Sequence, residues 1–174
     1  MRSLIYYVAA TVDGFIADTN HGVGMFAHDG DHAAEYLAAL RGYDTIVMGR
    51  KTWEFGQRLG VTDPYPWAET VVFGHFDESP DPRVRFTAED PHEVVRELKR
   101  KPGSPIYLAG GGDLARSLFD GKAIDELVVK INPVLLGSGV GLAPRLSSAV
   151  RLQARACSLH ASGVIVARYD VAYD

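Results

Sequence analysis

The sequence has only one cysteine, Cys157, among its 174 residues. One cysteine excludes an internal disulfide and every zinc site built from several cysteines. A chain of this length buries enough apolar surface to fold without such crosslinks. The sequence therefore predicts one domain over residues 1–174, located in a reducing compartment and expected to be cytoplasmic.

Long hydrophobic runs and blocks of like charge are also missing. The apolar stretch that begins at Leu4 is interrupted at Asp13, which leaves it too short for a membrane helix. The 18 basic and 22 acidic side chains give a formal net charge of −4 and are spread along the chain. We therefore expect neither a membrane nor a nucleic acid among the partners of this protein.

Short apolar runs are abundant, and glycine and proline residues separate them. Most of these runs are apolar at successive positions, which is typical of strands buried on both faces. They cover residues 4–10, 45–48, 70–73, 106–109 and 126–131. Helical patterns lie between them, over residues 31–41, 90–101 and 113–119. The helix at 90–101 has the clearest start, because Asp90 is a good N-cap and Pro91 suits the first helical position.

The C-terminal part follows a different pattern. Apolar and polar residues alternate from Val150 to Cys157, a turn is predicted at residues 160–163, and residues 164–172 suit another strand. This predicts an antiparallel hairpin with one wetter face. Together with the strand and helix alternation, it gives an α/β sandwich around a mostly parallel sheet.

Two glycine-bearing junctions between a strand and a helix are the strongest candidates for a binding site. The first runs from Gly49 to Thr52, and the second contains Gly110, Gly111 and Gly112. Backbone N–H groups at a helix N-terminus bind anions, and an arginine such as Arg50 suits phosphate. Taken alone, the first junction fits a capped helix with solvated cations equally well. Because both loops follow parallel strands, we expect them to share one sheet edge and to bind one ligand with two phosphate groups.

The second junction also matches the glycine spacing of a Rossmann dinucleotide site. That fold requires an acidic residue at the end of the next strand. Asp125 and Glu126 stand instead at the start of that strand. We therefore reject the Rossmann fold and retain the phosphate site.

Histidines provide weaker candidates. His75 follows a predicted strand, where its imidazole would donate to phosphate or simply be exposed. His28 and His32 are spaced four residues apart, but no third ligand with motif spacing accompanies them. No metal site is therefore predicted.

Four segments in order carry a resemblance to a known family. They are residues 9–17, AATVDGFIA; residues 47–53, VMGRKTW; residues 108–112, LAGGG; and residues 132–139, NPVLLGSG. With these segments the chain resembles the dihydrofolate reductase superfamily. It is most similar to the reductase domain of the bacterial riboflavin-biosynthesis bifunctional protein and its small stand-alone relatives. The resemblance implies a dihydrofolate-reductase-like three-layer sandwich with an antiparallel C-terminal hairpin.

The resemblance also implies NADPH as the cofactor, bound across the strand ends. Arg50 and Thr52 would contact the adenosine-side phosphates, and Gly49 and Lys51 would contribute through their backbone. The residues around the pyrophosphate would be Gly110, Gly111, Gly112, Asp113 and Leu114. His75 would lie near the 2′-phosphate, and Ala9, Ala10 and Ile16 would lie beside the nicotinamide.

The substrate side departs from the pattern of the superfamily. Ala33 stands near the position where dihydrofolate reductases carry a carboxylate, and Asp31 and Glu35 lie two residues to either side. Two residues rotate a helical side chain by about 200°, which argues against true dihydrofolate reduction. Asp13, Asp31 and Glu35 remain the candidate proton donors.

Met25 and Phe26 lie in the loop where the superfamily has a flexible lid, although packing on the core would explain them equally well. The leading hypothesis is an NADPH-dependent reductase of a small pterin-like, pyrimidine-like, carbonyl or imine substrate. The alternative is an NADP(H)-binding sensor or interaction module without turnover. The C-terminal hairpin suggests a homodimer, as in relatives.

Overall fold

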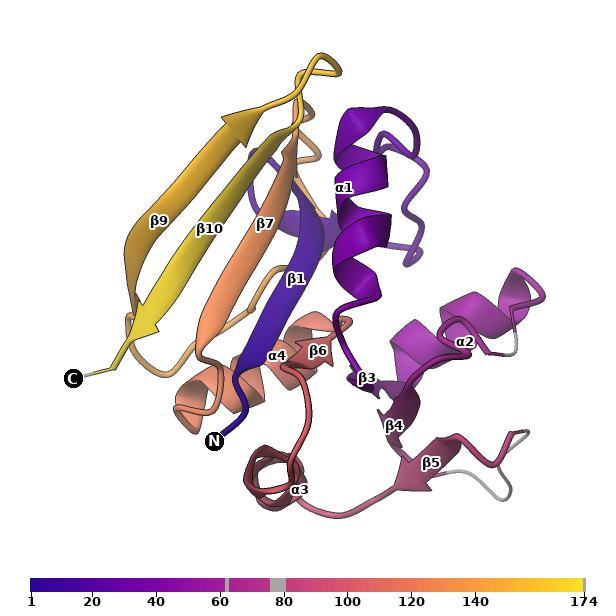
Figure 1. Ribbon diagram of the computed structural model, residues 1–174. Coiled ribbons are helices and arrows are strands. Elements are labelled where there is room, and N and C mark those ends of the chain that lie inside the picture. Colours follow the sequence, from indigo (N-terminus) through magenta and orange to yellow (C-terminus); the bar gives the residue numbers. More distant parts are fainter. Residues whose placement is uncertain (62, 76–80, 174) are drawn as a thin grey trace.

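The computed structural model describes residues 1–61, 63–75 and 81–173, which form an eight-stranded sheet with helices on both faces (Figure 1). The order of its strands is β5-β4-β3-β6-β1-β7-β10-β9. Their bounds are β1 Leu4–Thr11, β3 Thr45–Gly49, β4 Glu69–Phe73, β5 Val84–Thr87, β6 Ile106–Leu108, β7 Glu126–Asn132, β9 Arg151–Leu159 and β10 Ile165–Ala172.

The six strands from β5 to β7 are parallel, whereas β10 runs antiparallel to β7 and β9 runs antiparallel to β10. The central strands are buried on both faces, as their continuous apolar runs predict. Leu4 and Ile5, for example, are both buried although they point to opposite faces of the sheet. The predicted mostly parallel sheet with an antiparallel C-terminal hairpin is confirmed.

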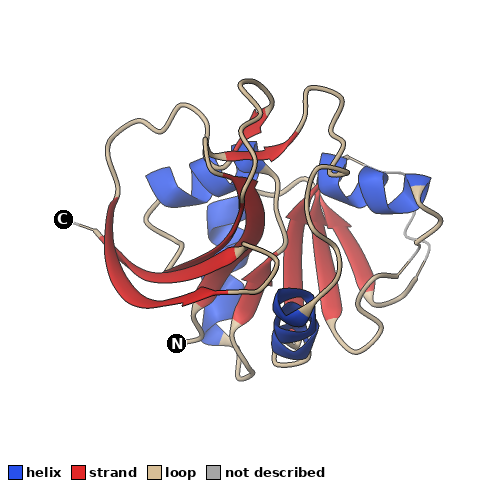
Figure 2. Ribbon diagram, turned by 90° about the horizontal axis from the view of Figure 1, so that it is seen from above, coloured by secondary structure: helices blue, strands red, loops and turns tan. Residues whose placement is uncertain are grey.

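Helices cover both faces of this sheet, as Figure 2 shows from above. They are α1 Asp31–Leu40, α2 Arg50–Arg58, α3 Pro91–Arg100 and α4 Gly112–Asp120. Leu98 of α3 and Leu118 of α4 belong to the apolar core on one face. Leu40 of α1 and Trp53 of α2 belong to the core on the other face. The three layers that the resemblance implies are therefore present.

The helix starts follow from their local sequence. Asp90 caps α3, because its carboxylate accepts a hydrogen bond of 2.7 Å from the backbone N–H of His92, and Pro91 takes the first helical position. Helix α1 begins at Asp31, so His28 lies outside it and does not share a helical face with His32.

Three parts of the fold differ from the expectation, and one of them is β5, which lies outside every strand that the sequence predicts. All nine residues of β9 are exposed, so the prediction of a hairpin with only one wetter face is wrong for this strand. Strands β2 (Phe15–Ala17) and β8 (Val140–Gly141) pair in a small second sheet that was not predicted, because such short strands show no periodicity. None of the helices in the described residues is both long and apolar enough to cross a membrane.

Candidate functional site

The two glycine junctions meet, because β3 and β6 are neighbours in the sheet. The backbone N–H of Gly49 donates to the carbonyl oxygen of Gly110 at 3.3 Å. The N–H of Gly111 donates to the hydroxyl oxygen of Thr52 at 3.2 Å. The expected shared edge is therefore present, and hydrogen bonds hold the two loops together.

Both junctions present the start of a helix. The N-cap residues, Gly49 of α2 and Gly111 of α4, make no capping hydrogen bond through a side chain. Helix N-termini of this kind carry N–H groups that suit an anion. Gly110 has a φ of 122°, a conformation that favours glycine, so the chain can turn here toward α4.

A cleft of about 800 Å³ opens at this edge of the sheet. It brings together most of the predicted cofactor residues, which come from β1, β2, α2 and the two junctions. Those that line it are Ala9, Ile16, Gly49, Arg50, Lys51, Thr52, Gly110, Gly111, Gly112, Asp113 and Leu114. Phe26, one of the two predicted lid residues, lines it as well.

Cationic side chains gather at the junction end of the cleft. Arg50 pairs with Glu54 at 2.5 Å, one turn along α2, and donates to the carbonyl oxygen of His75 at 3.4 Å. Arg145, which was not predicted, also lines the cleft and pairs with Asp113 at 3.3 Å. Together with Lys51, these groups make this end of the cleft suitable for an anion.

Three residues predicted to line the site do not line it. Ala10 is buried in the core on the α3 and α4 side of the sheet, because its side chain alternates with that of Ala9. Met25 lies in the loop before α1, where it is half-buried and outside the cleft lining. His75 is exposed, and its contact with Arg50 is made by its backbone carbonyl rather than by its imidazole.

Asp13 also lies outside the cleft lining. Its carboxylate accepts hydrogen bonds from the Thr11 hydroxyl at 2.6 Å and from the backbone N–H groups of Leu136 and Gly137, at 3.0 and 2.7 Å. The Thr11 hydroxyl and these N–H groups lower the pKa of Asp13, so it is ionised at neutral pH. The geometry gives Asp13 a loop-holding role and does not support proton donation.

Asp31 and Glu35 face the C-terminal hairpin instead of the cleft. His160 lies between them, 3.0 Å from the Asp31 carboxylate and 3.4 Å from that of Glu35. Arg168 of β10 donates to Glu35 at 2.8 Å. The hydrogen bond with His160 lowers the pKa of Asp31. Their predicted catalytic role is therefore not supported, because α1 turns these carboxylates away from the cleft.

His32 is buried, and hydrogen bonds occupy both of its ring nitrogens. Nε2 lies 3.2 Å from the carbonyl oxygen of Ala27, and Nδ1 lies 3.1 Å from the hydroxyl of Ser162. It therefore serves as a link between the loop before α1 and the hairpin. Across the part of the chain that the structure describes, no three His, Cys, Asp or Glu side chains gather in a way that suits a metal ion.

The cleft contains residues that the sequence analysis missed. Lys130 of β7 and Tyr36 of α1 line the cleft, and so do Gly139, Val140 and Gly141 around β8. A lysine between two apolar residues of a buried strand was the available signal for Lys130. Tyr36 was assigned to the apolar face of α1 without a role in the site.

Asn132 anchors the loop before α1. Its side-chain oxygen accepts from the N–H of Ala27 at 3.0 Å, and its amide nitrogen donates to the carbonyl oxygen of Lys130 at 3.1 Å. It is 2% exposed, so these bonds are shielded from water. One wall of the cleft is thereby fixed to the end of β7.

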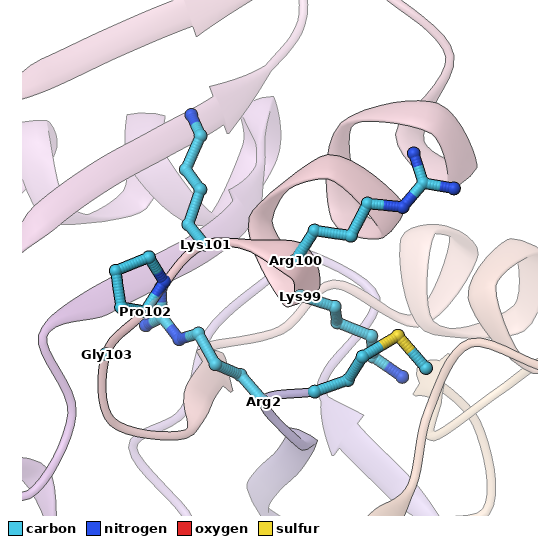
Figure 3. A pocket seen from close by; sticks show the side chains of 7 residues that line it. Arg2, Lys99, Arg100, Lys101, Pro102 and Gly103 are labelled. Atoms are coloured by element: carbon cyan, nitrogen blue, oxygen red, sulfur yellow. The ribbon is translucent and has the colours of Figure 1, made fainter.

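A second hollow, of about 540 Å³, lies near the N-terminus and the end of α3, and Figure 3 shows its lining. Its side chains do not converge on a common point, since Arg100 and Lys101 point away from each other. Lys99 pairs with Asp125 at 2.6 Å, and Lys101 pairs with Glu97 at 2.9 Å. Because the side chains of this hollow do not converge, the larger cleft is the better candidate for a ligand site.

The sheet, its helices and the cleft at the strand ends define the class as a dihydrofolate-reductase-like α/β protein with a reductase-type fold. The family model of the RibD C-terminal domain matches residues 2–166, and the chain belongs to this family. It is 32% identical over 156 residues to the uncharacterized protein YwjB of Bacillus subtilis (strain 168). This alignment covers 87% of the chain and 88% of YwjB.

Solved structures agree with this fold. A protein from Shewanella sp. PV-4, provisionally named as a riboflavin biosynthesis protein, gives a TM-score of 0.84 at 22% identity and covers 98% of this chain and 99% of its own. Dihydrofolate reductase from Enterococcus faecalis, solved in a complex with NADP(H), gives 0.66 at 16% identity, with 97% and 94% covered. The family assignment and the fold implied by the resemblance are confirmed.

Proposed function

We propose that the protein is an NADPH-dependent reductase of a small planar substrate. The observation that carries this proposal is the joining of two uncapped helix starts across neighbouring strands, through the contacts of Gly49 with Gly110 and of Thr52 with Gly111. Two adjacent anion sites on one rigid edge suit a ligand with several phosphate groups.

The residues of the cleft fit this cofactor at both ends. The N–H groups at the starts of α2 and α4, with Arg50, Lys51 and Arg145, would hold its phosphates. Asp113 would contribute through its backbone, since its carboxylate pairs with Arg145. Ala9 and Ile16 offer a flat apolar surface for the nicotinamide ring. When bound, the cofactor supplies a hydride, and the protein orients it and excludes water.

The first prediction concerns Arg50. Replacing it with alanine removes a charged contact to phosphate, so Arg50→Ala is expected to weaken NADPH binding by about 1.5–3 kcal/mol, or roughly 10- to 150-fold. Fluorescence titration of NADPH measures this change. Arg58→Ala is the matched control, because Arg58 is on the same helix but outside the cleft lining.

The control should bind NADPH as the unmodified protein does. Equal affinity in Arg50→Ala and Arg58→Ala would contradict the assignment of phosphates to this junction. Absence of NADPH binding by the unmodified protein would overturn the proposed function itself.

One observation favours a second candidate, an NADP(H)-binding protein without turnover. The three predicted proton donors, Asp13, Asp31 and Glu35, all lie outside the cleft lining. The two candidates separate when NADPH absorbance at 340 nm is followed against a panel of pterins, pyrimidines, quinones and imines. Tight NADPH binding without oxidation by any compound would favour the binding protein.

A further inference from the structure

The substrate half of the cleft is formed where β1, β7 and α1 meet. Ala9 of β1 pairs in register with Lys130 of β7, so their side chains are neighbours on the α1 face of the sheet. Tyr36 of α1 lies over Lys130, with 4.0 Å between the lysine Nζ and the centre of the ring. Phe26 and His28, from the loop before α1, complete this half.

Lys130 brings a positive charge into this half without a countercharge. Within residues 1–61, 63–75 and 81–173, no carboxylate pairs with its ammonium group, and the Tyr36 ring is the only partner described. The carboxylates of α1 do not compensate, because Asp31 and Glu35 are paired with His160 and Arg168. The ammonium group retains donors for a ligand, since an aromatic face accepts none in a conventional hydrogen bond.

The surroundings of Lys130 also strengthen the interaction of its charge with a ligand. Lys130 is half-buried, and the partial loss of its water shell lowers the pKa of its ammonium group. A charge in such a place interacts more strongly with a ligand than an exposed lysine does. Neighbours such as Ala9 and Val166, which pair with Lys130 on either side, provide no polar side chain to compete.

We infer that Lys130 determines substrate specificity by accepting only planar compounds that place a carbonyl or carboxylate oxygen beside the reducible carbon. The oxygen would receive a hydrogen bond from the lysine Nζ, while the flat body of the compound lies against Phe26. A cationic compound, such as an amidine or a protonated heterocycle, would meet an unpaired positive charge and be excluded. The position of the oxygen beside a reducible carbon rests on the proposed function, whereas the preference for anionic over cationic compounds does not.

Two planar probes of equal size and opposite charge, benzoate and benzamidine, test this inference. Saturation-transfer NMR measures their affinities without nucleotide and with NADP⁺ present. The unmodified protein is expected to prefer benzoate. Lys130→Met keeps an unbranched side chain, one atom shorter, and removes its charge, so it should bind benzoate at least about tenfold more weakly. Lys130→Arg, which keeps the charge, should retain the preference.

Lys101 provides the matched control, because it pairs with Glu97 at 2.9 Å and lies outside the cleft lining. Lys101→Met removes the same charge by the same substitution and is expected to leave the preference for benzoate unchanged. NADPH titration of Lys130→Met should still detect binding, because the proposed phosphate contacts are at the starts of α2 and α4, whereas Lys130 is in β7. The melting temperatures of all variants show whether they fold.

Preference for benzamidine, or equal benzoate binding by Lys130→Met and the unmodified protein, would overturn the inference. If Lys130→Met does not fold, loss of the preference for benzoate in Lys130→Arg would also overturn the inference. Failure of the unmodified protein to bind NADPH would instead overturn the proposed reductase function. The measurements without nucleotide would still decide the role of Lys130 in that case.

Discussion

At the scale of single residues, Asp13 shows how one carboxylate organises the surroundings of the cleft. It joins the end of β1 to the loop at Leu136 and Gly137 through three hydrogen-bonding partners. These bonds favour the ionised form, which lowers the pKa. The contribution of Asp13 to stability is therefore present above the ordinary carboxyl range, near pH 4, and is lost as the pH falls through the lowered pKa.

Asp13→Asn is therefore expected to lower the urea midpoint at neutral pH, because an amide has no second acceptor oxygen for the loop. The difference from the unmodified protein should shrink as the acid range is entered, since the unmodified carboxylate then becomes protonated. Urea unfolding at a series of pH values measures it. A difference that stays constant with pH would contradict the role of the charge.

The residue scale also shows where prediction from sequence stopped. The glycines and Arg50 share one cleft, as their positions after neighbouring buried strands predict. Lys130 was missed because it falls within a run that reads as a buried strand, and only the structure shows that its end reaches the cleft. Asp31 and Glu35 were overestimated, because the sequence does not give the rotation of α1 about its axis.

At the scale of elements, the start of α4 packs tightly against β8. A Cβ atom added at Gly112 would lie 2.2 Å from the carbonyl oxygen of Gly141, which is backbone and has little freedom to move. The glycine is therefore needed for close approach between the helix and the short strand, in addition to any contact with a ligand.

Gly112→Ala is expected to destabilise the protein by about 1–3 kcal/mol, because the clash outweighs the better helix propensity of alanine. Urea unfolding measures the loss. Gly24→Ala is the control, since a Cβ there meets nothing within 4 Å, and it should change stability by less than about 0.5 kcal/mol. Equal stability of the two variants would show that β8 gives way without cost.

Elements with a strong pattern of their own were predicted, and very short strands that form only by pairing with a distant segment were not. Helix α3 follows from Asp90, Pro91 and its apolar stripe, all within ten residues of each other. Strands β2 and β8 form through pairing between segments more than 120 residues apart, so no local pattern reveals them.

At the scale of the whole molecule, the outer strand β9 is unusual because every one of its residues is exposed. Leu152 and Leu159 have 43% and 76% of their surface exposed. Arg155 reaches inward to Asp170 and Glu126, at 3.2 and 3.3 Å, which leaves the apolar side chains of β9 available. We propose that a second copy of the chain covers this strand.

One chain has a mass of 18.9 kDa, and the unmodified protein is expected to sediment with twice this mass. The double variant Leu152→Asp with Leu159→Asp should sediment as a monomer, because it places charges in the contact. Leu37→Asp, on the exposed side of α1, is the control and should not change the mass. Sedimentation of the unmodified protein as a monomer would contradict this proposal.

The clamp made by Asn132 has a consequence for how the cleft is able to change. It fixes the loop at Ala27, while Asp18 builds a turn of its own by accepting hydrogen bonds from the N–H groups of Asn20 and Gly22, at 2.7 and 2.8 Å. The segment between these two points is attached at both ends to structures that do not depend on its own sequence. Insertions and substitutions in this segment would therefore reshape this wall of the cleft, while the sheet and the two glycine junctions stay intact.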